Sequence, residues 1–312
     1  MVQRLGAVDN LRNMVNVLRE VSFDDIRDDA QRPPSLVVVG PTEADALRLG
    51  ELLVGGSAGV TARDFSAPLA GLEEFEVVIV YGPDGQSERS GFADRLRSLG
   101  MAPPVLRLAG EPDRLEARIE SLRADLVRRL PERAPAFGRA YPAMRAAASK
   151  AVIDETAMAN AQFALVSNIP AIIPVIGGLA AAGADFIVLT KNQVMMVYKL
   201  AAIAGRDLDQ QVAIIQEIVP VVGVGFAWRS LARGAASMVP FAAGTLPKVG
   251  IAFAGTLMMG RAAEFYYRTN RRPTRAQLEG YTRQALAMLG RLPQMIGKRT
   301  NDARGGNGQS SE

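Results

Sequence analysis

The sequence predicts a small α/β domain with a mostly parallel sheet, followed by an apolar, all-helical domain. From residue 35 to about residue 130, short apolar runs alternate with amphipathic stretches, which is typical of a parallel sheet covered by helices. Beyond that point the composition changes, and no charged residue lies between Glu155 and Asp185. A chain of 312 residues that is 48% apolar has enough material for two hydrophobic cores and is not a disordered protein.

Four segments follow from these changes in composition. The N-terminal segment begins with apolar residues at helical spacing from Leu5 to Leu18 and ends in an acidic stretch that leads to Pro33 and Pro34. We expect an amphipathic N-terminal helix and linker at 1–34, the α/β domain at 35–130, the hydrophobic helical domain at 131–298, and a disordered Gly/Asn/Ser-rich tail at 299–312.

Composition excludes several classes of site. The chain has no Cys and no His, which excludes disulfides, thiol nucleophiles, the usual zinc sites and the commonest acid–base catalyst near neutral pH. The net charge is +4 and aromatic residues make up 6% of the chain, so a base-stacking nucleic-acid surface is not expected. We therefore expect no cofactor, no metal ion and no nucleic acid among its ligands.

The elements of the α/β domain are predicted from apolar runs and capping signals, in chain order. Ser35–Val39 is typical of a buried strand, and Thr42 followed by Asp45 is a capping box that starts a helix continuing to Val54. The remaining elements are strands at 60–65, 76–81 and 104–108, a helix around 87–99, and a helix from near Pro112 to Leu130.

The turn after the first strand has the layout of a phosphate-binding loop without its chemistry. After Gly40, a loop of the type G-x-x-x-x-G-K-[ST] needs a second glycine, a lysine and a hydroxyl to hold a polyphosphate and Mg²⁺. This chain has Asp45, Ala46 and Leu47 at those positions. Because the Asp45 carboxylate would repel a phosphate at the positive end of the helix dipole, the sequence predicts a nucleotide-domain scaffold that does not bind a nucleotide.

Two acids leave an alternative open at the carboxyl edge of the sheet, where ligands of parallel sheets bind. Asp84 and Asp113 follow predicted strands and could hold a metal ion. Both also stand in strong turn signals, Pro-Asp-Gly and Glu-Pro-Asp, so the competing interpretation is that they are turn and cap residues. A metal-dependent or ligand-binding site at this edge is therefore the alternative to a non-catalytic domain.

Three apolar runs dominate the second domain: the stretch between Glu155 and Asp185, Val212–Trp228, and Gly234–Gly260. Spanning a bilayer takes about 20 residues, so these runs could be membrane-inserted transmembrane helices. The alternative is a soluble helical bundle whose helices are apolar because they are central. Small residues would permit close helix packing within the domain or across a homo-oligomer: Gly177, Gly178, Ala181, Gly183, Gly250, Ala254 and Gly255.

A polar stripe interrupts the apolar pattern. Asp185 and Gln193 are eight positions apart, with Thr190 beside them, on a helix expected to begin near Phe186. Carboxylates and amides on such a stripe need partners if they are buried. The competing interpretation is that Asp185 caps this helix.

Aromatic and basic residues come together after the third apolar run. Tyr266 and Tyr267 are followed by Arg268, Arg271 and Arg272. This combination is typical of a cytoplasmic membrane boundary. In a soluble protein the same cluster would be a solvated helix end, and the sequence leaves both interpretations open.

The helical domain resembles a bacterial family of unknown function that often follows Era-like small GTPase domains. In that family an Ile-Pro segment rich in Gly and Ala leads to an Asp, and then to a Leu-Thr…Gln…Met helix that ends at a Gly. The matching elements are Ile169-Pro170, Asp185, Leu189-Thr190, Gln193, Met196 and Gly205, within a likeness that covers residues 145–270.

The resemblance implies membrane association and names no reaction. It also implies a preceding GTPase-like domain, but Ala109–Asp113 lacks the Asn-Lys-x-Asp guanine signature, so that domain is either a degenerate pseudo-GTPase or an unrelated flavodoxin-like sheet. We expect a non-catalytic scaffold or interaction protein at the cytoplasmic face of a bacterial membrane, or else in the cytoplasm. Its expected partners are membrane lipid, an active GTPase or other protein, and a second copy of the chain.

Overall fold

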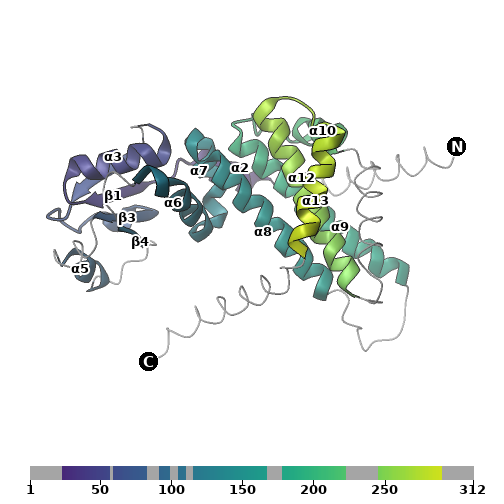
Figure 1. Ribbon diagram of the computed structural model, residues 1–312, viewed down its shortest axis with the longest axis horizontal. Helices are drawn as coiled ribbons and strands as arrows, with labels where there is room; N and C mark the ends of the chain where they lie inside the picture. Colours follow the sequence, from purple (N-terminus) through teal and green to yellow (C-terminus); the bar gives the residue numbers. More distant parts are fainter. Residues whose placement is uncertain are drawn as a thin grey trace. The chain divides into compact units, whose positions relative to one another are not determined.

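The computed structural model describes residues 23–56, 59–82, 91–98, 105–109, 115–166, 178–222 and 245–289 (Figure 1). The chain divides into two compact units. The α/β unit contains residues 24–152 and 202–206, and the helical unit contains the remainder. The sequence placed the boundary near residue 130, but the segment up to Val152 belongs to the α/β unit because α7 (Ala134–Ala140) packs against α2 (Asp24–Gln31) and α6 (Leu115–Arg129).

The α/β unit is built on a four-stranded, fully parallel sheet, which confirms the predicted mixed α/β class. Its strands are β1 (Leu36–Gly40), β2 (Val60–Asp64), β3 (Val77–Gly82) and β4 (Val105–Ala109), in the order β2-β1-β3-β4. β1 pairs with β2 from Leu36 opposite Val60 and with β3 from Leu36 opposite Val77. The order reverses between β1 and β3, which makes the carboxyl ends of these two strands the usual place for a ligand in such sheets.

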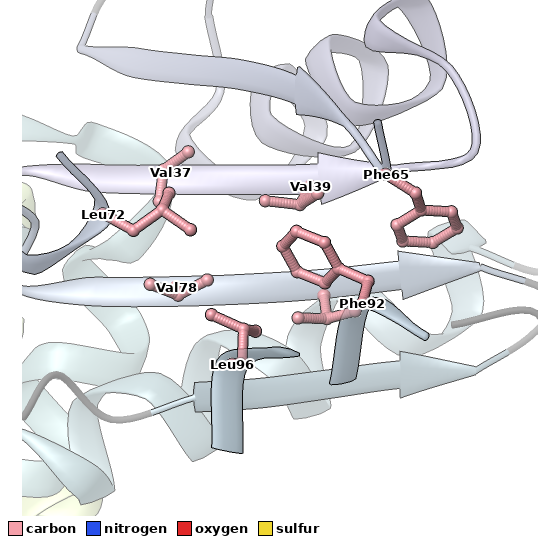
Figure 2. Packing of buried hydrophobic residues seen from close by; sticks show 8 residues of the cluster. Val37, Val39, Phe65, Leu72, Val78, Phe92 and Leu96 are labelled. Carbon is pink, nitrogen blue, oxygen red and sulfur yellow. The ribbon is translucent and has the colours of Figure 1, made fainter. Parts of the chain in front are cut away.

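The strands form from short valine-rich runs because both faces of the sheet are covered. All residues of β1 and β3 are buried. Figure 2 shows Val37, Val39 and Val78 packed on one face against Phe65, Leu72, Phe92 and Leu96. Phe92 and Leu96 belong to the short helix α5 (Phe92–Ser98), whereas α3 (Glu43–Val54) packs on β1 and β2.

The local structure of α3 agrees with the sequence prediction, whereas that of α2 does not. Thr42 is the N-cap of α3, as the capping box predicted, and Gly55 closes the helix in the left-handed conformation (φ 81°). Gly50 lets α3 approach the sheet, since a Cβ there would lie 2.2 Å from Cγ1 of Val60. The acidic stretch at 24–31 is helix α2 and not the linker that the sequence suggested, because its carbonyl end is held by a distant arginine.

That arginine is Arg133, which is almost completely buried at the amino end of the sheet. Its Nε and Nη2 donate to the two carboxylate oxygens of Glu76 at 2.9 and 3.0 Å. The same guanidinium donates to the main-chain oxygens of Asp29 and Arg32 at the end of α2. Nearby, burial and the Glu76 carboxylate raise the pKa of the Tyr141 phenol. A charge and its partners therefore fix α2 to the start of β3.

The helical unit takes most of α8 (Arg145–Val166) and α9 (Gly178–Ile203), with α10 (Gln211–Val222), α12 (Thr245–Thr269) and α13 (Arg275–Leu289). α12 packs against both α10 and α13. Its core is rich in small and flexible side chains, including Ala161, Met196 and Ala254. A Cβ on Gly260 would lie 2.7 Å from Cγ1 of Ile153 and 3.1 Å from the sulfur of Met196, so three helices meet closely at this glycine.

The prediction of transmembrane helices is wrong for the helices that the structure describes. None of them combines the length and the apolar character that a bilayer span requires. α8 and α9 each contain only one end of the first run, and α9 and α12 both extend beyond the runs into segments with ionic residues, Lys191 and Lys199 in α9 and Arg261 and Glu264 in α12. Parts of the predicted runs, at 167–177 and 223–244, lie outside the described residues.

Candidate functional site

The turn from β1 to α3 is the first place to look for a ligand, because it lies at the carboxyl edge of the sheet. Gly40 ends β1, and a Cβ there would lie only 3.2 Å from the backbone nitrogen of Ala46. The Asp45 N–H donates to Oγ1 of Thr42 at 3.1 Å, and the Ala46 N–H donates to the Thr42 carbonyl at 3.1 Å. The Thr42 hydroxyl in turn donates to Oδ2 of Asp45 at 2.7 Å.

These contacts close the start of α3 with the chain's own atoms. The Ala46 N–H forms the first hydrogen bond within the helix, and the Asp45 N–H, one of the first-turn amides that could face a phosphate, already has the Thr42 hydroxyl as acceptor. The Asp45 carboxylate lies at the same helix end. Ala46 is buried beneath the turn, and Leu47 is exposed on α3. Asp45, Ala46 and Leu47, which stand where a phosphate-binding loop has its second glycine, lysine and hydroxyl, therefore belong to a capped helix.

The end of the neighbouring strand β2 is closed in a similar way, which the sequence did not indicate. Oδ1 of Asp64 accepts hydrogen bonds from the Ser66 N–H at 2.7 Å and from the Ser66 hydroxyl at 2.6 Å. The hydroxyl first, and then the backbone bond, lower the pKa of the Asp64 carboxyl. The sequence Asp-x-Ser at the end of β2 could have predicted this turn, because Asp and Ser side chains form hydrogen bonds with nearby backbone groups.

The alternative site at this edge depends on residues beyond the described ranges. Asp84 and Asp113 both lie outside them, so the structure gives no geometry for either carboxylate. Within the described part of the chain, no cluster of three or more metal-ligating side chains is placed to hold an ion.

The predicted polar stripe is realised in part, as a buried network between α8, α9 and α12. Nε2 of Gln193 donates to Oγ1 of Thr256 at 3.3 Å. Nδ2 of Asn160 donates to the same oxygen at 2.8 Å, and Oδ1 of Asn160 accepts from Nδ2 of Asn192 at 2.7 Å. Asn160 and Thr256 are completely buried. This network consists of neutral amides and a hydroxyl, and it holds three helices in one register.

The other two members of the predicted stripe are Asp185 and Thr190. Asp185 does not cap a helix, because α9 begins at Gly178 and the acid is inside it. Thr190 is half-buried on α9. Asn160, Asn192 and Thr256 were missed by the sequence analysis, although isolated polar residues within apolar helices at 145–166 and 245–269 were a usable signal.

The aromatic and basic cluster lies at the turn between α12 and α13. Arg268, Arg271 and Arg272 are exposed, and Tyr266 and Tyr267 are half-buried in the last turns of α12. The two tyrosine rings pack edge to face with centroids 5.6 Å apart. The cluster therefore presents three exposed guanidinium groups on one short segment at a helix end, an arrangement that both interpretations share.

Hydrogen bonds fix the backbone that carries these arginines. Asn270 takes the left-handed conformation (φ 53°), and its N–H donates to the Tyr266 carbonyl at 2.7 Å. The Arg271 N–H donates to Oγ1 of Thr269 at 3.2 Å. Thr274 and Gln277 exchange capping hydrogen bonds at the start of α13.

Comparison with known proteins adds no assignment: no family model, no curated protein and no solved structure matches this chain. The likeness of residues 145–270 to a family found behind GTPase domains accordingly stays a hypothesis. The features that bear on function are the hydrogen-bonded turns after β1 and β2, the buried polar network and the exposed arginines between α12 and α13.

Proposed function

We propose that this chain is a non-catalytic interaction protein, in which a nucleotide-domain scaffold without a nucleotide accompanies a helical part that contacts partners. One observation carries the proposal. The start of α3, where a nucleotide domain would hold phosphates, is occupied by the chain's own Thr42 and Asp45. A phosphate would have to displace these contacts and would meet a carboxylate at close range.

Electrostatics makes this substitution costly for a polyphosphate. In working loops, a lysine and the helix dipole both favour the anion. At the corresponding helix start, this chain has the carboxylate of Asp45, and the neighbouring Ala46 and Leu47 offer neither a cation nor a hydroxyl. The same strand-turn-helix frame is then suited to present its surface to another protein, either a GTPase or a second copy of the chain.

A titration with fluorescent GTP and ATP analogues in the presence of Mg²⁺ tests the proposal. We expect no saturable binding to the full chain at micromolar concentrations. The matched variant is Gly40→Trp, whose indole would fill the turn. Saturable micromolar binding to the unmodified chain that Gly40→Trp abolishes would show that the turn is a working site and that the proposal is wrong.

A further inference from the structure

We propose that the α12–α13 turn docks this protein onto the anionic headgroups of a membrane surface, through charge and without a spanning helix. The inference rests on the proposed function, because it names one partner of the interaction protein. The docking patch, called the arginine turn below, consists of Arg268, Arg271 and Arg272.

The arginine turn is positive because the acids beside it are engaged elsewhere. Glu264, one helical turn before Arg268, pairs with Arg261 at 2.9 Å. Glu279, in the second turn of α13, pairs with Arg275 at 3.1 Å. Each of these acids is therefore matched by an arginine outside the patch. The three arginines of the patch are all exposed. They lie within five consecutive positions of the chain, so their positive charges add up on one short segment.

Folding alone does not account for all of these charges. Arg268 is favourable at the C-terminus of α12, where the helix dipole attracts cations. Arg271 and Arg272, however, come just before α13, whose first turn has no acid and begins with Arg275. Positive charge near the positive end of a helix is unfavourable. An anionic surface outside the chain would relieve this repulsion at the start of α13.

The patch is also preorganised. Asn270, Thr269 and the Thr274–Gln277 capping pair fix the backbone on both sides of the arginines, and Pro273 is buried between them. A fixed backbone loses little conformational entropy when it binds. The guanidinium side chains are then the main groups that must be ordered.

A lipid surface fits this patch better than nucleic acid does. Tyr266 and Tyr267 lie next to the arginines, half-buried, with their rings packed on each other. Tyrosine beside arginine is characteristic of the headgroup region of membranes. Binding of single-stranded nucleic acid relies instead on exposed aromatic faces onto which bases stack, and these two rings are occupied by each other.

The test is cosedimentation of the full chain with vesicles of phosphatidylcholine alone and of phosphatidylcholine mixed with phosphatidylglycerol. One variant carries Arg268→Gln, Arg271→Gln and Arg272→Gln. The matched control removes the same charge from exposed arginines of the α/β unit, with Arg48→Gln, Arg128→Gln and Arg129→Gln. Thermal unfolding followed by circular dichroism establishes that both variants are folded.

We expect salt-sensitive binding to the anionic vesicles alone, weaker by about fivefold for each arginine removed from the turn and by about a hundredfold for all three. The control variant should bind nearly as the unmodified chain. Equal binding of the two variants, binding that ignores lipid charge, or no binding to anionic vesicles would overturn the inference. Retention on duplex or single-stranded DNA in place of vesicles would overturn it as well, and none of these results would alter the outcome of the nucleotide titration.

Discussion

In the α/β unit a charged group, the guanidinium of Arg133, is almost completely buried, whereas the helical unit buries neutral amides and a hydroxyl around Thr256. Arg133 donates to the Glu76 carboxylate and to two main-chain oxygens. Removing it takes this donor from both main-chain oxygens and leaves Glu76 with the longer ion pair to Arg32, at 4.0 Å. Thr256 accepts from two amides and donates to the Ala252 carbonyl, which fills the bonding capacity of its oxygen.

The two units also differ in how their cores are packed. Branched aliphatic side chains fill the space beside the sheet, as Figure 2 shows for Val37, Val39 and Val78. The helical unit instead brings backbones close through residues such as Gly260 and Ala254. A core of branched side chains is sensitive to truncation, and a core of small residues is sensitive to enlargement. The difference can be sharpened by substitutions that act on one unit at a time.

The largest effect is expected for Arg133→Met. It should lower the free energy of unfolding of the α/β unit by about 3 kcal/mol, because the half-buried Glu76 carboxylate loses its two close hydrogen bonds and keeps the longer ion pair with Arg32, at 4.0 Å. Urea denaturation followed by circular dichroism measures the loss. The control Arg128→Met acts on an exposed ion pair with Asp125 and should cost less than about 1 kcal/mol. Similar losses for both variants would show that the buried ion pair of Arg133 contributes no more to stability than an exposed one.

A smaller effect is expected for Thr256→Val, which keeps the shape of the side chain and removes the oxygen. The donors of Asn160 and Gln193 then lose their acceptor, and the helical unit should be destabilised by about 2 kcal/mol. The control is Thr282→Val. The single hydrogen of the Thr282 hydroxyl is shared between two acceptors, the Leu278 carbonyl and the Met258 sulfur, so its removal leaves no donor unpaired among these partners. A loss at Thr256 no larger than at Thr282 would show that the network does not stabilise the three helices.

The smallest effect is expected for enlarging Gly260. An alanine there would press on Ile153 and Met196, which outweighs the gain in helix propensity and leaves a net loss of about 1 kcal/mol. Gly280→Ala is the matched change on α13, where a Cβ meets nothing within 4 Å, and it should raise stability by up to about 1 kcal/mol. The same sign at both glycines, measured by thermal unfolding, would argue against close packing at Gly260.

Local structure in the α/β unit was predictable because its signals act over a few residues. Thr42 and Asp45 define the start of α3 by bonds between positions three apart, and the predicted strand at 60–65 differs from β2 by one residue. The predicted linker at the acidic stretch was wrong, because α2 is held by Arg133, about a hundred residues away in the sequence. Such a partner cannot be read from local periodicity.

The helical part was harder to predict for a related reason. Long apolar runs have the same composition whether a helix is central in a bundle or lies in a lipid bilayer. Composition therefore led to the prediction of transmembrane helices, which is wrong for the helices that the structure describes. One of the two interpretations made Asp185 a helix cap because Asp favours that position, but α9 begins at Gly178 and contains Asp185. Asn160 and Thr256 are 96 positions apart, so only the packed helices bring their side chains together.

By itself the sequence determined the order of the four strands along the chain, the N-cap of α3, the degenerate chemistry after Gly40 and the cluster of arginines after Tyr267. These depend on neighbouring residues, whose side chains and backbones meet in any fold that forms the local element. The tertiary structure decided that Arg133 is buried against Glu76, that Gln193 faces Thr256, and that Gly260 is a point of close approach. Those contacts join residues that are distant along the chain, and folding fixes them only when the separate elements pack.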